Sequence, residues 1–160
     1  MPHKQEEVRS LVYENKFYVL GLIETRVSRL NFSPIAKELI RGWNVTSNLN
    51  HHRNGRLWVL WNPDTVDVTT LYSSSQIIHI SMRVIEKELT FFAYFFYAFN
   101  SYIDRTPLWV DISSIASNVQ DRPWILLGDF NVCGSLLRNL EISLGLHIWM
   151  ISMNAALELK

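Results

Sequence analysis

The predicted order of elements indicates an α/β domain of the α+β kind, in which two mixed β-sheets pack together and helices cover their outer faces. Two apolar runs, Phe17–Ile23 and Trp124–Leu127, are typical of strands buried on both faces. Between them lies a stretch of β-favouring residues broken by turn signals. The order is helix, strand, helix, a run of mostly antiparallel strands, helix and strand. This order favours two stacked sheets over a single doubly wound sheet.

Three segments carry helix signals. Lys4–Asn15 is amphipathic, because its apolar residues recur on one face. Ser33 and Thr106 are each followed by a proline, which combines a capping hydroxyl with a residue favoured in the first turn. The sequence therefore predicts two further helices, Ser33–Arg41 and Thr106–Val119.

Five strands are predicted between the second and third helices. Their ranges are Trp43–Ser47, Arg56–Trp61, Asp67–Tyr72, Gln76–Val84 and Glu88–Tyr97. Asn54-Gly55 favours a hairpin turn, since both residues tolerate positive φ. The aromatic run Phe91–Tyr97 is expected to be a buried central strand. Beyond Cys133 the pattern fades: Ser135–Leu146 is a weak helix candidate, and Ile148–Lys160 has no clear period.

The composition bounds the class of protein. The 160 residues are enough for one domain, and 48% of them are hydrophobic, which supports a buried core. The formal net charge is zero, which argues against a dedicated high-affinity nucleic-acid binder. The single cysteine, Cys133, allows no internal disulfide. The polar segment Met1–Ser10 is no secretory signal, and Phe91–Phe99 is too short to span a bilayer, so we expect no membrane association.

Two acids follow the two apolar runs. Glu24 comes directly after Phe17–Ile23, and Asp129 comes shortly after Trp124–Leu127. An acid at the end of a buried strand is costly unless a cation or a ligand-binding cleft faces it, and strand ends in α/β sheets commonly bind ligands. The alternative interpretation is that each acid simply begins an exposed loop. If the extended conformation continues to Asn131, Asp129 and Asn131 project to one side and Phe130 points into the core.

Several separate motifs together resemble the endonuclease/exonuclease/phosphatase superfamily. They are Leu22–Thr25, Tyr97–Asn100 and Trp124–Asn131, in that order. Within the superfamily the chain looks most like the apurinic/apyrimidinic-type endonuclease domain of plant non-LTR (LINE-type) retrotransposons. The supporting segments are His3–Arg9, Gly55–Pro63 and Asp104–Trp109. The resemblance implies a partial four-layer, deoxyribonuclease-like sandwich.

The resemblance also implies roles for individual residues. Glu24 matches the family's magnesium ligand, and Asp129 matches the aspartate that orients or deprotonates the attacking water. Asn131, Tyr97 and Asn100 match residues that contact the scissile phosphate. The implied cofactor is Mg²⁺, with Mn²⁺ as the alternative, and the implied substrate is DNA. This ancestry predicts a nuclear or cytoplasmic location.

The chain also departs from the family pattern. The resemblance covers residues 3–133, and 134–160 is interpreted as a divergent C-terminal tail. The family's N-terminal asparagine motif is missing, and so is its C-terminal Asp-His pair; His147 has no acid before it. Losing one acid–base group costs roughly 10²- to 10⁴-fold in rate. We therefore expect a domain with weak or no activity.

Other interpretations stay open at this point. One is a phosphoester phosphatase of the same superfamily, and another is a non-catalytic interaction module or gene fragment. Arg26 and Arg105 are candidate nucleic-acid-binding residues, although scattered surface arginines are the simpler interpretation of these and of Arg29, Arg53 and Arg56. His51 and His52 are expected in a solvated hairpin tip, and His79 is expected as a satisfied core residue. The sequence gives no oligomeric state.

Overall fold

The computed structural model describes residues 2–53, 55–119, 122–131 and 147–151. The elements in chain order are α1 (Pro2–Asn15), β1 (Val19–Ile23), α2 (Arg29–Leu39), β2 (Asn44–Ser47), β3 (Leu57–Trp61), β4 (Val66–Ser73), β5 (Ile77–Val84), β6 (Leu89–Tyr97), α3 (Tyr102–Val119), β7 (Trp124–Asp129) and β8 (His147–Ile151).

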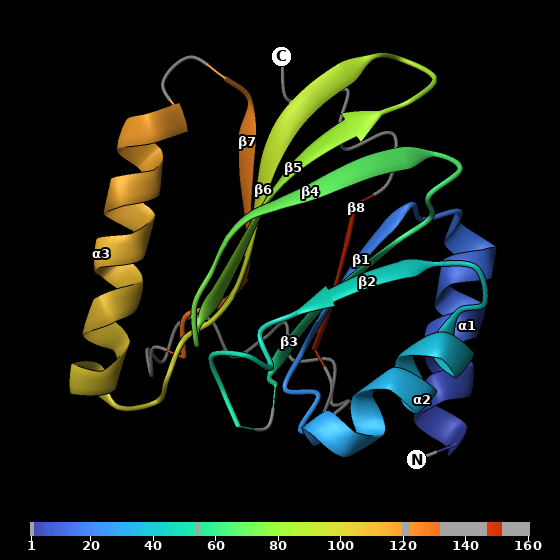
Figure 1. Ribbon diagram of the computed structural model, residues 1–160, viewed down its shortest axis with the longest axis horizontal. Coiled ribbons are helices and arrows are strands. Elements are labelled where there is room, and N and C mark those ends of the chain that lie inside the picture. The colour runs from blue at the N-terminus through green and yellow to red at the C-terminus, as the bar shows by residue number, and fades with distance from the viewer. Residues whose placement is uncertain (1, 54, 120–121, 132–146, 152–160) are drawn as a thin grey trace.

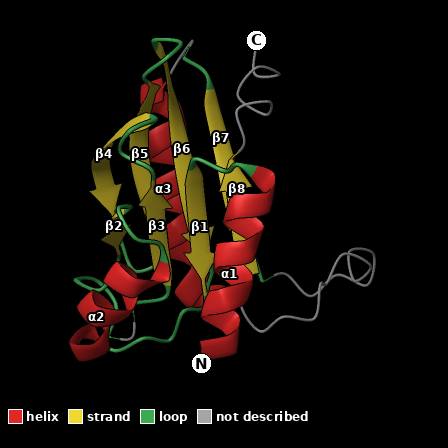
Figure 2. Cartoon of the chain, turned by 90° about the vertical axis from the view of Figure 1, so that its right-hand side faces the viewer, coloured by secondary structure: helices red, strands yellow, loops and turns green. Residues whose placement is uncertain are grey.

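The strands form two four-stranded sheets, in the orders β2-β3-β1-β8 and β4-β5-β6-β7. Pairing is antiparallel except between β6 and β7, which run parallel. The sheets pack face to face, with α1 and α2 outside the first sheet and α3 outside the second (Figure 1). Figure 2 shows β7 and β8 on the same side of the sandwich. The predicted fold class, two packed sheets flanked by helices, is confirmed.

Alternation along the strands builds three apolar layers from near-continuous apolar runs. In β1, Val19 and Ile23 face the second sheet, whereas Leu20 and Leu22 face α1 and α2. The aromatic strand β6 divides in the same way. Its inner set packs between the sheets (Phe91, Ala93, Phe95, Tyr97), and its outer set packs toward α3 (Phe92, Tyr94, Phe96). The prediction that Phe91–Tyr97 is a buried central strand is therefore confirmed.

Two helix starts were predicted one turn too late. α2 begins at Arg29 and contains Pro34, and α3 begins at Tyr102 and contains Pro107. Each proline therefore lies beyond the first turn and removes only one intrahelical bond. In α2, the first turn closes through Asn31 N, which donates to Ser28 O at 3.0 Å.

The first sheet has a strand that the sequence reasoning missed. β8 pairs antiparallel with β1, with His147 opposite Ile23 and Ile151 opposite Val19. It lies in the segment interpreted as a divergent tail, so part of that segment belongs to the sheet. The domain boundary after residue 133 stays a prediction. Ser135–Leu146, the weak helix candidate, and Asn54 of the predicted hairpin turn lie outside the described residues.

Two polar groups on the outer face of β5 and β6 are buried without a partner. His79 and Tyr94 are cross-strand neighbours with stacked rings 4.3 Å apart. The His79 Nε2 atom and the Tyr94 hydroxyl have no hydrogen-bond partner among the described residues. His79 lies in the strand as predicted, but its Nε2 is not satisfied by any described residue. Burial lowers the pKa of His79, so its ring favours the neutral form.

Tyr94→Phe is expected to stabilise the protein. It removes a buried hydroxyl that has no partner, and we expect the free energy of unfolding in urea at pH 7 to rise by about 1 kcal/mol. Burial also raises the pKa of Tyr94 to about 12. The folded state therefore keeps a proton that the unfolded chain releases from about pH 10 upward. Wild-type stability should fall between these two pH values, and the variant should fall less steeply; equal slopes would contradict the burial of this hydroxyl.

Candidate functional site

The centre of the candidate site is Tyr97, which joins the two sheets. Tyr97 is the last residue of β6 and belongs to the inner set, so its side chain points toward the first sheet. Its hydroxyl donates a hydrogen bond to Oε1 of Glu24, the residue directly after β1. Arg26 Nη2 lies 3.2 Å from the same oxygen. The carboxylate is thus held at the sheet end, with 21% of its side chain exposed.

The second predicted acid lies beside Tyr97 on the neighbouring strand. Asp129 ends β7 and is the register partner of Tyr97 across the parallel pair. The Asn131 backbone N donates to Asp129 Oδ1 at 2.7 Å, and the Asn131 Nδ2 donates to Ala98 O at 2.5 Å. The Asn131 side chain also hydrogen-bonds with the Tyr97 side chain. Four predicted site residues, Glu24, Tyr97, Asp129 and Asn131, are therefore brought together.

The backbone at this site is not extended, contrary to one expectation. Asn131 has φ +49°, so the extended conformation stops before it. Asp129 and Asn131 meet through their hydrogen bond instead of through strand alternation. Glu24 and Arg26 also have positive φ, of 56° and 49°. Such conformations cost non-glycine residues on the order of 1–3 kcal/mol and cluster at functional sites.

Phe130 anchors the loop that carries Asn131. Its ring lies 4.2 Å from the ring of Phe96 and stacks on Trp109 at 5.1 Å. The expectation that Phe130 points into the core while its neighbours face the site is confirmed.

Arg105, on α3, holds the same loop through hydrogen bonds to its backbone. Only 8% of Arg105 is exposed, and its Nη1 donates to Phe130 O at 2.8 Å and to Asn131 O at 2.6 Å. These bonds give it a positioning role that the sequence did not indicate, because the partners are 25 and 26 residues away. Its predicted contact with nucleic acid stays a prediction.

Arg105→Met should lower the free energy of unfolding by about 1–3 kcal/mol, because two partly buried carbonyl oxygens lose their donor. Chemical denaturation measures this change directly. The matched control is Arg41→Met, which removes an 85%-exposed arginine paired with Glu38 and should change stability by no more than about 0.5 kcal/mol. Equal effects of the two substitutions would contradict the positioning role.

Two buried amides also shape the site, and sequence reasoning missed both. Gln76 is 1% exposed; its Nε2 donates to Asp104 O at 3.0 Å, and its Oε1 accepts from Phe99 N at 2.7 Å. It therefore holds the loop that carries Asn100. Asn48 is fully buried and connects the two sheets, since its Nδ2 donates to Ser75 O at 2.9 Å and its Oδ1 accepts from Leu57 N. Asn48 begins the polar stretch in which a solvated hairpin tip with His51 and His52 was predicted, so that stretch starts with a buried residue.

The remaining predicted residues lie at the rim. Asn100 is exposed and lines an open groove beside Tyr97 with Phe99, Ser101 and Arg56. The Arg26 side chain, which pairs with the Glu24 carboxylate, is 74% exposed. Burial, followed by the hydrogen bond to Glu24, raises the pKa of Tyr97. Tyr97 therefore keeps its proton at neutral pH and acts as a hydrogen-bond donor.

The donor set bears on the predicted metal. No group of three or more His, Cys, Asp or Glu side chains converges within the described ranges. Mg²⁺ does not require such a group, because it keeps several water ligands and binds through one or two carboxylates. A single partly buried carboxylate at a strand end, steadied by the Tyr97 hydroxyl, fits that cation.

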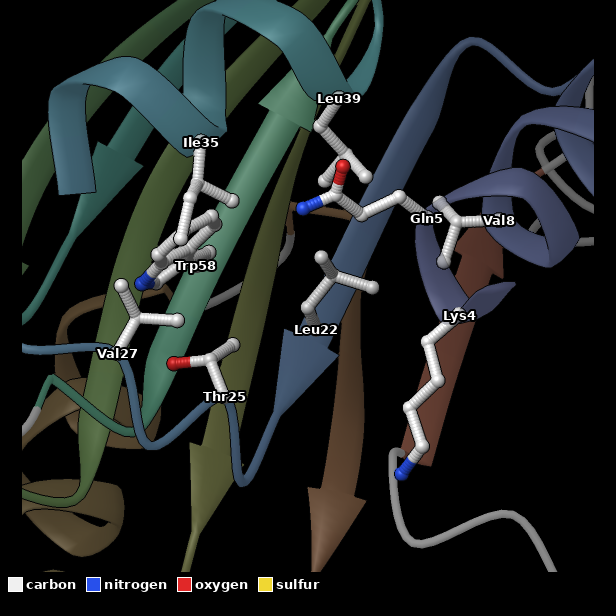
Figure 3. A pocket seen from close by; sticks show the side chains of 9 residues that line it. All are labelled: Lys4, Gln5, Val8, Leu22, Thr25, Val27, Ile35, Leu39 and Trp58. Carbon is white, nitrogen blue, oxygen red and sulfur yellow. The ribbon is translucent and has the colours of Figure 1, made fainter. Parts of the chain in front are cut away.

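A separate cavity lies on the opposite face of the first sheet. It holds about 80 Å³ between α1, α2 and the sheet, and Leu22, Trp58 and Leu39 contribute to its wall (Figure 3). Lys4 extends away from the other labelled side chains in Figure 3. The wall is almost wholly apolar and includes none of the predicted site residues, so it offers no phosphate-binding groups.

No helix in the described part of the chain is long and apolar enough to cross a membrane.

Comparison with solved structures identifies the fold. The chain superposes on a mannosyl-6-phosphatase from Bacteroides thetaiotaomicron with a TM-score of 0.60 and 13% identity, covering 82% of this chain and 57% of that one. An endonuclease/exonuclease/phosphatase family protein from the same bacterium gives 0.57 and 13%, covering 82% and 54%. The endonuclease domain of TRAS1, a telomere-specific non-LTR retrotransposon, gives 0.59 and 14%, covering 81% and 54%.

These likenesses define the extent of the match. The chain spans a little more than half the length of these three structures. No protein-family model matches the sequence, and no curated protein matches it. At 13–14% identity the likeness concerns the fold, and the motif resemblance points to the same superfamily. The chain therefore has the endonuclease/exonuclease/phosphatase fold that its sequence motifs predicted.

Proposed function

We propose that this chain is a divalent-metal-dependent phosphodiester hydrolase domain of the retrotransposon DNA endonuclease type. The observation that carries the proposal is the position of Tyr97, which hydrogen-bonds Glu24 from one sheet and lies beside Asp129 of the other. Acids, amides and a phenol that converge at strand ends suit the binding and hydrolysis of a phosphoester. The fold shared with the TRAS1 endonuclease domain supports the choice of DNA.

Each residue has a role that follows from its chemistry. Glu24 would hold the cation, and a bound Mg²⁺ would polarise the phosphoryl oxygen. Protonated Tyr97 donates a hydrogen bond to the scissile phosphate. Asp129 accepts a proton from the attacking water, and Asn131 and Asn100 donate to phosphate oxygens. Arg26 leaves Glu24 and pairs with the nucleic-acid backbone; its 74% exposure allows this movement.

We also propose that this chain alone is a slow enzyme. Of the two acids beside Tyr97, Glu24 is assigned to the cation, which leaves Asp129 as the proton acceptor among the described residues, and the family's Asp-His pair has no counterpart in the sequence given. A site that lacks part of a cooperative group retains little of its rate. The expected activity is nicking that long incubation reveals.

The test compares two kinds of substrate. Purified protein is incubated with supercoiled plasmid DNA and separately with p-nitrophenyl phosphate, in Mg²⁺, Mn²⁺ or EDTA, beside the Asp129→Asn variant. We expect slow metal-dependent nicking that falls about 10²- to 10⁴-fold in the variant. Faster hydrolysis of the monoester than of DNA would favour the phosphatase alternative. Equal background in wild type, variant and EDTA would leave the non-catalytic interpretation standing.

A further inference from the structure

One arginine at the rim has an unusual setting. Arg56 directly precedes β3, and because Ile23 pairs with Leu57, Arg56 lies opposite Glu24 at the same sheet end. Its guanidinium carbon lies 5.4 Å from the ring centre of Tyr97 and 5.6 Å from that of Phe99. Within the residues that the structure describes, Arg56 forms no salt bridge. Two aromatic rings thus flank the Arg56 guanidinium.

The guanidinium also borders an open groove, which Asn100 of the predicted site lines as well. Arg56, Phe99, Asn100 and Ser101 line one groove, and Tyr97, three residues before Asn100, reaches Glu24. The ring of His52 lies 5.9 Å from that of Phe99. Burial and then the Arg56 charge lower the pKa of His52, so His52 is neutral at neutral pH. Asp104, on the far wall, is the acid of this groove.

An arginine in this setting suits a phosphate. Its planar fork binds two phosphate oxygens at once, and stacking on aromatic rings fixes the plane of the fork before the ligand arrives. A small phosphomonoester offers only one phosphate, and that phosphate binds at the Glu24–Tyr97 site. A polynucleotide offers a second phosphate one nucleotide further along the backbone. Arg56 lines the groove with Asn100, and its guanidinium carbon lies beside the Tyr97 ring.

We propose that Arg56 binds the backbone phosphate next to the scissile one, so that the site selects a polynucleotide over a small phosphoester. This inference rests on the proposed function of the Glu24–Tyr97 site. The same observations separate Arg56 from three other arginines, whose side chains have polar partners. Arg26 is paired with Glu24, and Arg29 donates to Leu49 O at 2.9 Å. Arg83 pairs with Asp67.

The test measures the salt dependence of DNA binding. A fluorescent single-stranded DNA decamer is titrated with the full chain in Ca²⁺ at several salt concentrations. The variants are Arg56→Ala, Arg56→Lys and the control Arg41→Ala, which removes the same charge from the segment just after α2. Each lost contact with a single-strand phosphate should reduce the slope of log affinity against log salt by about 0.7. We expect Arg56→Ala to show this reduction and about tenfold weaker binding, and Arg41→Ala to match wild type.

The remaining outcomes separate the inference from the proposed function. Arg56→Lys should keep the wild-type slope but bind more weakly than wild type, because it retains the charge and loses the fork. If Arg56→Ala keeps the wild-type slope while wild type nicks DNA, the inference fails and the proposed function stands. If wild type neither binds the decamer nor nicks plasmid, both fail.

Discussion

Glu24→Gln should strongly reduce metal-dependent nicking while leaving the fold intact. The amide preserves the shape of the side chain and can still accept a hydrogen bond from Tyr97, but it lacks the charge that attracts a hard cation. We expect a fall on the order of 10²- to 10³-fold, the size seen when one electrostatic partner of a transition state is removed. The measurement is single-turnover nicking of supercoiled DNA at saturating Mg²⁺.

The control for this prediction is an acid outside the site. Asp67 forms an exposed pair with Arg83 on the β4–β5 hairpin, so Asp67→Asn removes one carboxylate without touching Glu24 or Tyr97. We expect Asp67→Asn to nick at the wild-type rate. If Glu24→Gln nicks DNA at the wild-type rate, Glu24 takes no part in the reaction.

Gly128→Ala should cause the largest loss of stability. A Cβ at position 128 would lie 2.0 Å from the backbone O of Phe96 and 2.6 Å from the Cδ1 of its ring. Because Gly128 is the register partner of Phe96, β7 would have to move away from β6 and carry Asp129 with it. Overpacking of this kind costs about 1–3 kcal/mol, and backbone contacts put it at the upper end. The midpoint temperature of thermal unfolding should fall by several degrees.

A second glycine separates this steric effect from a conformational one. Gly42 has φ +82°, and nothing lies within 4 Å of a Cβ built there. Gly42→Ala should therefore cost only the strain of a left-handed backbone, about 1 kcal/mol. It should also leave DNA nicking unchanged, because Gly42 follows α2 on the outer layer. If Gly128→Ala is no worse than Gly42→Ala, the close approach of β6 and β7 is not as described.

The two sheets could be predicted because a strand that is buried on both faces has a recognisable run of apolar residues in the sequence. β1 and β6 are covered on both faces, so their residues are apolar almost without interruption, and the acids after β1 and at the end of β7 stand out. The starts of α2 and α3 were predicted wrongly from their prolines, because in this structure each proline lies one turn inside its helix. β8 escaped because its segment carries no clear alternation, and its partner β1 is more than a hundred residues away in the chain.

The site could be predicted only in part, for a related reason. Motif resemblance pointed to Glu24, Tyr97, Asp129 and Asn131, and the structure brings these four together. It could not indicate that Gln76 and Arg105 hold the loops that carry the site. Their partners are backbone atoms 23 to 28 residues away, and a backbone atom leaves no signature in the sequence. The left-handed Asn131 was missed because the prediction extended the strand through it, although asparagine is one of the residues that readily adopt positive φ.

The central claim is that the ends of both sheets meet at one cation site built on Glu24 and Tyr97. Paramagnetic broadening by Mn²⁺ in amide NMR spectra tests it without requiring catalysis. At substoichiometric Mn²⁺ we expect the amide resonances of Glu24, Tyr97 and Asn131 to broaden first, with that of Asp67 unaffected, and Glu24→Gln to remove the selective broadening. Equal broadening at Asp67, or unchanged broadening in Glu24→Gln, would contradict the account.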